Sequence, residues 1–392
     1  MPESQERHAL VIGAGLAGAA ACAALSRRGW RLTLLDAAAG AAQAASALPV
    51  GMLSPHVTRA PTPLSRLSVL GMPDTLAELR RLVPQGHGWQ ACEVDNRGHD
   101  PGRHPAALVR PAALVQAWLD EAARLTAFST HWLAPVHTLA REHGAWHALD
   151  LQGRRLAQAP VVVVASAFGS RALLVEHGDR VDADHLPLRP VKGQMSLALQ
   201  QGTPLAPRPQ RDKGVFVPLY QDAGLPPRWP AQVWAMGSTY ERGHDDTALS
   251  VAAHEANACS LAPLCPPAAL QLRDALARGT LQGWAQVRCA SMDRLPLVGG
   301  APDSAVLRSI ATATGRARTS LEDTPRLAGL YLLTALGSRG LTLAHWCATR
   351  LASIMDREAP IPEELDLLRA IDPARFAWRH RRRQTPSTRV GA

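Results

Sequence analysis

The amino-acid sequence predicts an α/β protein in which a mainly antiparallel sheet is inserted into a domain built on a central parallel sheet. Residues 8–36 follow the order strand, glycine turn, helix, strand. Four consecutive valines at 161–164 indicate a strand buried on both faces, as in a parallel sheet. Residues 186–289 instead contain short alternating segments between proline-rich loops, which are typical of antiparallel strands. With 392 residues, of which 46% are hydrophobic, the chain is long enough for two cores.

The opening unit, HALVIGAGLAGAAACAALSRRGWRLTLLD, points most directly to a ligand. Gly13, Gly15 and Gly18 form the pattern G-x-G-x-x-G between the first strand and the helix. The first glycine permits a tight turn, the second lets the backbone approach a pyrophosphate, and the third lets helix and strand pack closely. Asp36 ends the second strand, where a carboxylate can accept hydrogen bonds from ribose hydroxyls. The unit therefore predicts a Rossmann-like dinucleotide-binding domain.

The segment after this unit is expected to line the bound dinucleotide. Residues 44–58, AASALPVGMLSPHVT, are rich in small residues and prolines and predict a loop rather than a third regular element. The loop follows the glycine unit closely in the chain. We therefore predict that Ser46, Gly51 and Met52 contact the cofactor.

The middle of the chain alternates between helical and strand patterns. Residues 61–84 and 111–125 repeat apolar residues at helical spacing, whereas 85–105 read as irregular. VVVVA at 161–165 predicts a central strand of the parallel sheet. The antiparallel insertion is expected to contain the strands GQMSLAL, GVFVPLY, QVWAMGSTY and GWAQVRC.

The parallel pattern returns near the C-terminus. Residues 329–355 run from a strand through a glycine turn into a helix. Gly337, Gly340 and Leu341 lie at the start of this helix, whose partial positive charge suits negative charge on a cofactor. We therefore predict that these three residues contribute to cofactor binding.

These patterns divide the chain into interleaved parts. The predicted dinucleotide-binding domain is discontinuous and comprises residues 1–85, 106–185 and 290–375. The predicted substrate domain comprises 86–105 and 186–289. Residues 376–392 are expected to form a loose basic tail.

Composition limits the class of protein and the compartment. The formal net charge is +9, which favours a polyanionic partner such as RNA, but the only lysines are Lys192 and Lys213, so a GC-rich genome explains the arginine excess equally well. Six cysteines without C-x-x-C spacing predict a reducing cytoplasm and neither a metal site nor a redox pair. His143 and His147 lack an H-E-x-x-H context and are interpreted as surface residues. Neither a targeting peptide nor a membrane span is expected.

Several longer strings resemble a known family. The order of elements resembles the FAD-dependent amine-oxidase superfamily of D-amino acid and glycine oxidases. ASALPVGMLSPH, RPVKGQM, GWAQVRCASMDRLPLVG, GLYLLTALGSRGLTLA and DPARFAWRHRRR are similar to the oxidoreductase half of the bifunctional MnmC family, which modifies the wobble uridine of certain tRNAs. The resemblance covers nearly the whole chain. The family's methyltransferase half has no counterpart in the sequence, which leaves a separate methyltransferase open as a partner.

The resemblance implies FAD as cofactor, tRNA as partner and a specific oxidation. In that family the carboxymethylaminomethyl group of 5-carboxymethylaminomethyl-2-thiouridine is oxidised, a hydride passes to flavin N5, glyoxylate is released and an aminomethyl group remains. The substrate is chemically an N-substituted glycine. The reaction needs a free amine, a residue that holds the carboxylate, and a C–H bond over the flavin. No histidine is predicted as a base, because a neutral amine can lose a hydride directly.

The resemblance also implies the catalytic residues. Arg288 and Arg339 match the places of carboxylate-binding arginines in glycine oxidases, and a planar guanidinium suits a carboxylate. Lys192, in VKGQM, matches a basic residue near the flavin that stabilises the reduced form or assists oxygen chemistry. Arg294 is interpreted as structural. For Tyr240, contact with the substrate and packing within the sheet both remain open.

Some features depart from the family pattern or leave its function open. Ser46-Ala47-Leu48-Pro49 replaces a Ser-Gly-Asn-Pro-like sequence, and 165–168 replace a plainer Ala-x-Gly turn, so cofactor contacts there are expected to differ. The C-terminal RFAWRHRRR interleaves Phe376 and Trp378 with arginines, a composition able to bind RNA but equally typical of an unstructured tail. Two alternative functions stay open, namely oxidation of a free small amine such as glycine, sarcosine or a D-amino acid, and non-catalytic tRNA binding.

Overall fold

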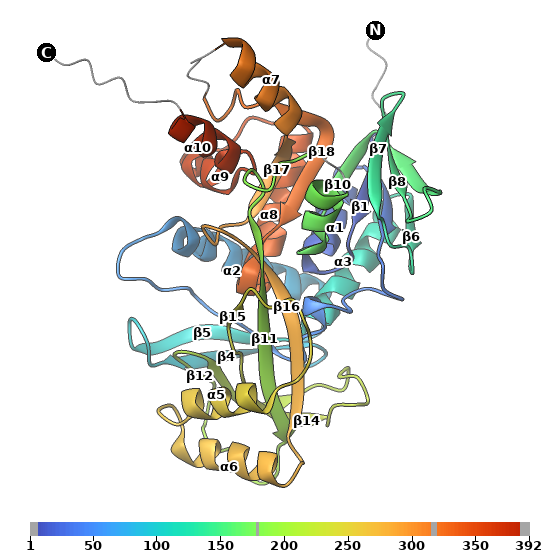
Figure 1. Ribbon diagram of the computed structural model, residues 1–392. Helices are drawn as coiled ribbons and strands as arrows, with labels where there is room; N and C mark the ends of the chain where they lie inside the picture. The colour runs from blue at the N-terminus through green and yellow to red at the C-terminus, as the bar shows by residue number, and fades with distance from the viewer. Residues whose placement is uncertain (1–6, 178–179, 315–319, 385–392) are drawn as a thin grey trace, which may run out of the picture.

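A computed structural model describes residues 7–177, 180–314 and 320–384 of the chain. Two large sheets dominate it, one of six strands and one of nine, and a small sheet of three strands lies beside the first (Figure 1). The architecture confirms the predicted fold class of a parallel sheet combined with an antiparallel one. No helix among the described residues is long and apolar enough to cross a membrane.

The six-stranded sheet contains the predicted βαβ unit. Its order is β17-β18-β10-β1-β2-β6, and all neighbours are parallel except β17. Val162, Val163 and Val164 of the central strand β10 are fully buried, as the valine run predicts. The strands are β1 (His8–Ile12), β2 (Arg31–Leu35), β6 (Phe128–His131), β10 (Val161–Val164), β17 (Leu297–Pro302) and β18 (Arg326–Thr334).

Helices cover one face of this sheet and the small sheet covers the other. Ala9, Val11 and Val163 pack with residues of α1 (Leu16–Ser26), α3 (Pro111–Leu125) and α8 (Gly340–Met355). Leu10 and Val162 pack on the opposite face with Trp146. Trp146 belongs to the three-stranded sheet, which consists of β7 (Thr138–Glu142), β8 (Ala145–Leu149) and β9 (Arg155–Ala159). Alternating residues of each strand thus enter different cores.

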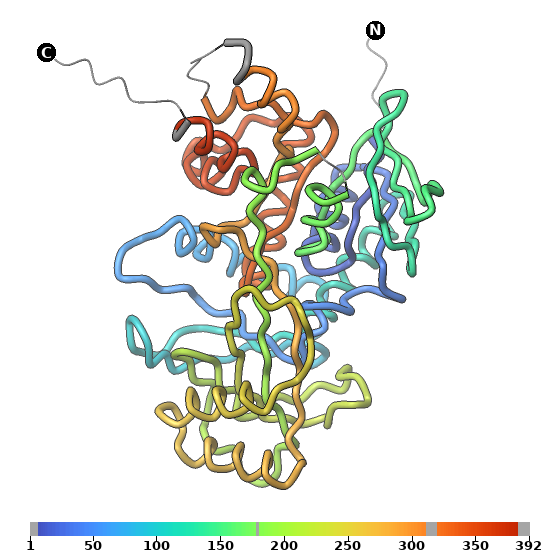
Figure 2. The backbone as a smooth tube through the Cα atoms, in the orientation of Figure 1, coloured from blue at the N-terminus to red at the C-terminus, as the bar shows by residue number. Residues whose placement is uncertain are grey.

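The antiparallel sheet is built around one long strand pair. β11 (Leu188–Leu199) pairs with β16 (Gln282–Ser291), and the two run side by side from the upper to the lower half of the molecule (Figure 2). The helices α5 (Val251–Leu261) and α6 (Pro266–Ala277) cover the lower part of this sheet. Its remaining strands are β3 (Gly51–Leu53), β4 (Trp89–Asn96), β5 (Gly102–Val109), β12 (Gln210–Arg211), β13 (Val215–Gln221), β14 (Gln232–Gly237) and β15 (Glu241–Arg242).

Several local predictions were wrong. Residues 85–105 are not irregular, because they hold β4 and the first half of β5. The predicted loop 44–58 contains a 3-10 turn and β3, which is only three residues long and forms because it pairs with β5. Helices α5 and α6 were not predicted within the insertion. The domain boundaries stay a prediction. β3 and the second half of β5 lie in segments assigned to the dinucleotide-binding domain, although both strands belong to the antiparallel sheet.

The predicted loose tail is helical over its first part. The helix α10 (Arg375–Gln384) follows α9 (Leu365–Ile371), and residues 385–392 lie outside the described residues. Phe376 is 8% exposed and belongs to the core on the small-sheet side. Arg375 is 1% exposed and donates two hydrogen bonds to Asp293. These buried contacts hold the helix to the body of the protein.

A cluster of charges with two buried carboxylates fixes the C-terminal end of α1. Arg27, which follows the last residue of α1, donates to the carboxylates of Glu78 and Glu121. Glu78 lies in α2 (Pro63–Leu82) and is 6% exposed, and it also accepts a hydrogen bond of 2.8 Å from the Trp118 indole. Burial raises the pKa of Glu78, but the charges of His345 and Arg27 outweigh this effect and leave its pKa below the ordinary value. The ionised cluster therefore ties α1, α2, α3 and α8 together.

Glu78→Gln is expected to destabilise the fold, because Arg27 loses a buried partner. Because Arg27 is partly exposed and keeps Glu121, the expected loss is about 1.5–3 kcal/mol, the value for hydrogen bonds to charged groups, which a chemical unfolding curve can measure. The control is Glu322→Gln, since Glu322 forms an exposed ion pair with Arg369 and should change stability by about 0–1 kcal/mol. The pKa of Glu78 is lowered in the folded state, so its contribution is present at neutral pH and lost as the pH falls through the folded pKa. Equal stability of the two variants would contradict the assignment.

Candidate functional site

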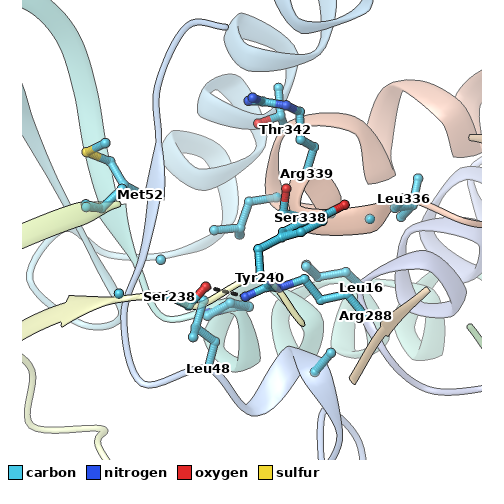
Figure 3. A pocket seen from close by; sticks show the side chains of 18 of the residues that line it. Leu16, Leu48, Met52, Ser238, Tyr240, Arg288, Leu336, Ser338, Arg339 and Thr342 are labelled. Atoms are coloured by element: carbon cyan, nitrogen blue, oxygen red, sulfur yellow. Dashed lines mark hydrogen bonds between the residues drawn. The ribbon is translucent and has the colours of Figure 1, made fainter. Parts of the chain in front are cut away.

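A cavity of about 710 Å³ lies between the layer of the parallel sheet and the antiparallel sheet (Figure 3). Its volume falls within the range of typical ligand and cofactor sites. The lining comes from stretches that are far apart in the sequence: the start of α1, segment 45–57, strands of the antiparallel sheet, and residues 333–342. The cavity thus joins the predicted dinucleotide motif to the predicted arginines.

The glycine motif forms a tight corner at one end of this cavity. Gly13 has φ +106°, and a Cβ atom there would lie 2.7 Å from the Ala165 carbonyl oxygen. A Cβ atom on Gly18 would lie only 1.7 Å from the carbonyl oxygen of Gly13. Neither position accepts a side chain, so both glycines are needed to bring α1 against β1.

The start of α1 presents free hydrogen-bond donors to the cavity. Gly15, Leu16 and Ala17 line it, and among the described residues no acceptor pairs with the N–H groups of Gly15 and Ala17. The Leu16 N–H donates to Ser46 Oγ at 3.0 Å, which leaves the Ser46 hydroxyl proton able to donate elsewhere. The first turn of α1 contains no acidic residue. These features fit a diphosphate group.

Asp36 lies beside this corner rather than among the residues that line the cavity. Its two carboxylate oxygens accept hydrogen bonds from the backbone N–H groups of Ala14, at 2.6 Å, and Ala38, at 2.8 Å. Each carboxylate oxygen can accept a further hydrogen bond. Asp36 therefore stabilises the glycine turn and can still accept a hydrogen bond from a ribose hydroxyl.

The other predicted cofactor residues surround the same cavity. A Cβ atom on Gly51 would lie 2.7 Å from Leu341 Cδ1, and one on Gly340 would lie 3.1 Å from Leu16 Cδ1. The start of α8 therefore approaches β3 closely at Gly51 and the start of α1 closely at Gly340. The structure brings to this cavity the predicted residues Gly15, Ser46, Gly51, Met52, Gly337, Gly340 and Leu341.

Arg288 lies on β16 and its guanidinium group reaches the cavity (Figure 3). The group donates to Ser238 Oγ and, at 3.3 and 3.4 Å, to the carbonyl oxygen of Thr239. It also lies 5.7 Å from the centre of the Tyr240 ring, a distance that allows a cation–π contact. Burial lowers the pKa of Arg288, but a guanidinium group stays protonated in proteins. No ion pair with a carboxylate joins Arg288 within the described chain.

Gly193, which the sequence analysis did not single out as a functional residue, makes room for this guanidinium. It lies on β11, opposite β16, and a Cβ atom there would be 1.7 Å from Arg288 Nη2. Any side chain would displace the guanidinium group from its place across the strand. Gly193 stands in the VKGQM string, but its role depends on strand register, which the sequence does not reveal.

Arg339 lines the cavity from the turn before α8 (Figure 3). Its Nη2 donates to His56 Nδ1 at 2.7 Å. Burial and the neighbouring charge of Arg211 lower the pKa of Arg339 to about 10. Burial, together with the charges of Arg339, Arg211 and Arg294, lowers the pKa of His56 to about 4, so His56 is neutral at pH 7.

Lys192 is not brought together with the two arginines. It is 5% exposed, does not line the cavity, and donates a hydrogen bond to Asp246 Oδ1. This bond holds the pKa of Asp246 below its ordinary value. Lys192 is thus a buried lysine paired with a carboxylate. None of its contacts supports the predicted role near a flavin.

Two further cations line the cavity and were not predicted. Arg211 donates to Ser54 Oγ at 2.7 Å, to the Pro55 carbonyl at 2.6 Å and to Asn96 Oδ1 at 3.2 Å. Lys213 lies two residues further on and is exposed. The only acidic residue among those lining the cavity is Asp212, which is also exposed. No motif marks Arg211, because the approach of β12 to segment 45–57 is a tertiary contact.

Comparisons with known proteins identify the relatives of this chain. A sequence model of the FAD dependent oxidoreductase family matches residues 8–99 and 77–354. The tRNA 5-methylaminomethyl-2-thiouridine biosynthesis bifunctional protein MnmC of Verminephrobacter eiseniae is 35% identical over 94% of the chain, and that of Delftia acidovorans is 37% identical over 95%. The chain spans 63% and 61% of the length of these two relatives.

Solved structures share the fold. Glycine oxidase from Geobacillus kaustophilus superposes with a TM-score of 0.65 at 16% identity, covering 92% of this chain and 98% of the other. Iminodiacetate oxidase from Chelativorans sp. BNC1 gives a TM-score of 0.65 at 18% identity, covering 93% of this chain and 98% of the other. The fold is therefore that of glycine oxidase and related enzymes.

Gly15→Val is expected to abolish retention of FAD. A Cβ atom at position 15 already lies 3.0 Å from Ser46 Oγ, so the larger side chain fills the space in front of the free N–H groups. The measurement is the flavin absorbance per mole of purified protein. Ala39→Val adds a similar volume at an exposed position and should retain the wild-type flavin content. An unchanged flavin content in Gly15→Val would refute the assignment of the diphosphate site.

Proposed function

The chain belongs to the FAD-dependent oxidoreductase family, and we propose that it oxidises the carboxymethylaminomethyl group of a tRNA wobble uridine to the aminomethyl form. The observation that carries the substrate class is the Arg288 guanidinium, which has no carboxylate partner and reaches a cavity whose charged lining residues are mostly cations. A partly buried cation without an acidic partner favours an anionic ligand. The carboxylate of an N-substituted glycine supplies one.

The residues at the other end of the cavity fit FAD. Its diphosphate would meet the N–H groups of Gly15 and Ala17 and the Ser46 hydroxyl, and Asp36 keeps acceptor capacity for the ribose. When bound, FAD supplies the two-electron acceptor that amine oxidation requires. The close approach of Gly51 and Gly340 to their neighbours leaves backbone, not side chains, along that part of the cavity.

The protein's own groups would hold the substrate in a fixed orientation. Arg288 binds the carboxylate, and its contacts to Ser238, Thr239 and Tyr240 fix the plane of the guanidinium group beforehand. Arg339 provides a second cation in the same cavity, and neutral His56 orients it. Lys192 has no role in this proposal, because its ammonium group is already paired with the Asp246 carboxylate.

The reaction needs water and the two-electron acceptor that bound FAD would supply. The CH2 group between the nitrogen and the carboxylate would give up a hydride to that acceptor, which leaves a protonated C=N bond. Water would then split this bond and release the proton, and an external oxidant such as O2 would restore the acceptor. The products are glyoxylate and the aminomethyl group on the uridine. Among the described residues that line the cavity no carboxylate stands ready as a buried base, and a neutral amine needs none.

The proposal of a tRNA substrate draws on the curated relatives, whose names describe tRNA 5-methylaminomethyl-2-thiouridine biosynthesis by a bifunctional protein. The chain spans about three-fifths of the length of these relatives, and a methyltransferase is proposed to act on the product. The net charge of +9 supports a polyanionic substrate. Among the C-terminal residues suggested for RNA binding, Arg375 and Phe376 are buried and are withdrawn from that role.

The decisive experiment is turnover of modified tRNA by the purified flavoprotein. We expect nucleoside mass spectrometry to show conversion of the carboxymethylaminomethyl nucleoside to the aminomethyl form, with one glyoxylate released per conversion. Free glycine, sarcosine and D-amino acids serve as competing substrates. Turnover of a free amino acid with untouched tRNA would establish the first alternative. Binding of tRNA without bleaching of the flavin under anaerobic conditions would establish the second.

Arg288→Met is expected to weaken the use of modified tRNA while leaving flavin content unchanged. If Arg288 is the main partner of the carboxylate, kcat/KM should fall by the equivalent of about 2–5 kcal/mol. Gly193→Ala should act in the same direction, because a Cβ atom there collides with Arg288 Nη2. Gly40→Ala is the matched glycine control, since its Cβ would meet only the flexible end of Gln43. Wild-type kinetics in Arg288→Met would remove the residue from the substrate site.

A further inference from the structure

Arg211 and Lys213 lie at an edge of the cavity that one substrate carboxylate does not explain. Arg211 contacts only neutral acceptors, namely Ser54, Pro55 and Asn96, and its Nη2 has no hydrogen-bond partner within the described chain. Lys213 has neither a hydrogen bond nor an ion pair to the described residues. Arg288, in contrast, is held by three neighbours, and its strand β16 is separated from β12 in the sheet by β11, β14 and β13.

The local backbone presents both cations to the same space. Arg211 ends the two-residue strand β12, and Lys213 follows two positions later. Both residues line the cavity. Asp212, between them, is the only acid in the lining and is exposed to solvent. The charge at this edge is therefore +1 from Arg211, Lys213 and Asp212 together, before Arg339 is counted.

A second cavity of about 420 Å³ adjoins this edge. It shares Lys213, Gly214, Ser238 and Tyr240 with the first cavity and continues to the start of α5. Tyr240 is 46% exposed, and the guanidinium groups of Arg288 and Arg242 each lie 5.7 Å from its ring centre. An exposed aromatic ring beside arginines that form no described ion pair is a combination that proteins use to hold single-stranded nucleic acid.

We propose that Arg211 and Lys213 bind a backbone phosphate of the RNA that carries the substrate group, at a site separate from the carboxylate site at Arg288. This inference rests on the proposed function, because it assigns the polynucleotide part of the same substrate. A phosphate oxygen accepts from the free Nη2 of Arg211 and from the Lys213 ammonium. The pair then contributes affinity for tRNA that a free amino acid or nucleoside does not gain.

The test measures binding of an unmodified anticodon stem-loop RNA to the FAD-loaded enzyme at several salt concentrations. For Arg211→Gln and for Lys213→Gln we expect weaker binding, and each plot of log K against log salt should be shallower by about 0.7, the value for one lost phosphate contact on a single strand. Arg211→Lys should restore the slope. Arg124→Gln, which removes an exposed charge on α3 away from the cavity, should keep the wild-type slope.

The outcomes separate this inference from the proposed function. Wild-type slopes in both Arg211→Gln and Lys213→Gln, or no binding of the RNA by the wild type, would overturn the phosphate site. Because Lys213 is exposed and makes no described bond, Lys213→Gln reports on the site even if Arg211→Gln disturbs segment 54–56. The proposed function is tested by a separate measurement. It fails if the wild-type protein binds the stem-loop but releases no glyoxylate when it is incubated with modified tRNA.

Discussion

The close approach of α1 to β1 is the constraint on which the site depends. Gly18 lies so near the Gly13 carbonyl that a single methyl group would separate helix and strand. This approach aims the amino end of α1, with its free N–H groups, into the space between the two sheets. At the other end of α1, Arg27 is held by buried carboxylates. One helix therefore has an anion-binding end and a firmly fixed end.

The arrangement of charge differs sharply between the cavity and the core behind α1. The buried carboxylates of Glu78 and Glu121 neutralise Arg27 and Arg81, so this cluster stabilises the fold. In the cavity, neutral oxygen atoms and the His56 nitrogen hold Arg211, Arg288 and Arg339 in place. Neutral partners fix the direction of a guanidinium group without cancelling its charge. The protein thus keeps its cations oriented while their charge remains available to a ligand.

The fold class and the dinucleotide site could be predicted from strong local patterns, whereas the family and FAD came from the resemblance of longer strings. Helices α2 and α3 follow from apolar periodicity, and β10 follows from its valine run. Strands β3 and β12 could not be predicted, since segments of two or three residues gain their stability from partners distant in the chain. The same reason hides Gly193 and Arg211, whose roles exist only once neighbouring strands are in register. Lys192 stands in a suggestive string, yet its side chain pairs with Asp246 instead of reaching the cavity.

The pairing of β11 with β16 has a consequence for how this protein can change over evolutionary time. The ladder runs without interruption from Leu188 opposite Ser291 to Leu197 opposite Gln282, and Arg288 stands opposite Val191 within it. Insertion or deletion of a single codon in either strand would turn the guanidinium to the opposite face of the sheet. Length variation among descendants of this gene should therefore collect in the connecting loops, while these two strands keep a constant number of residues.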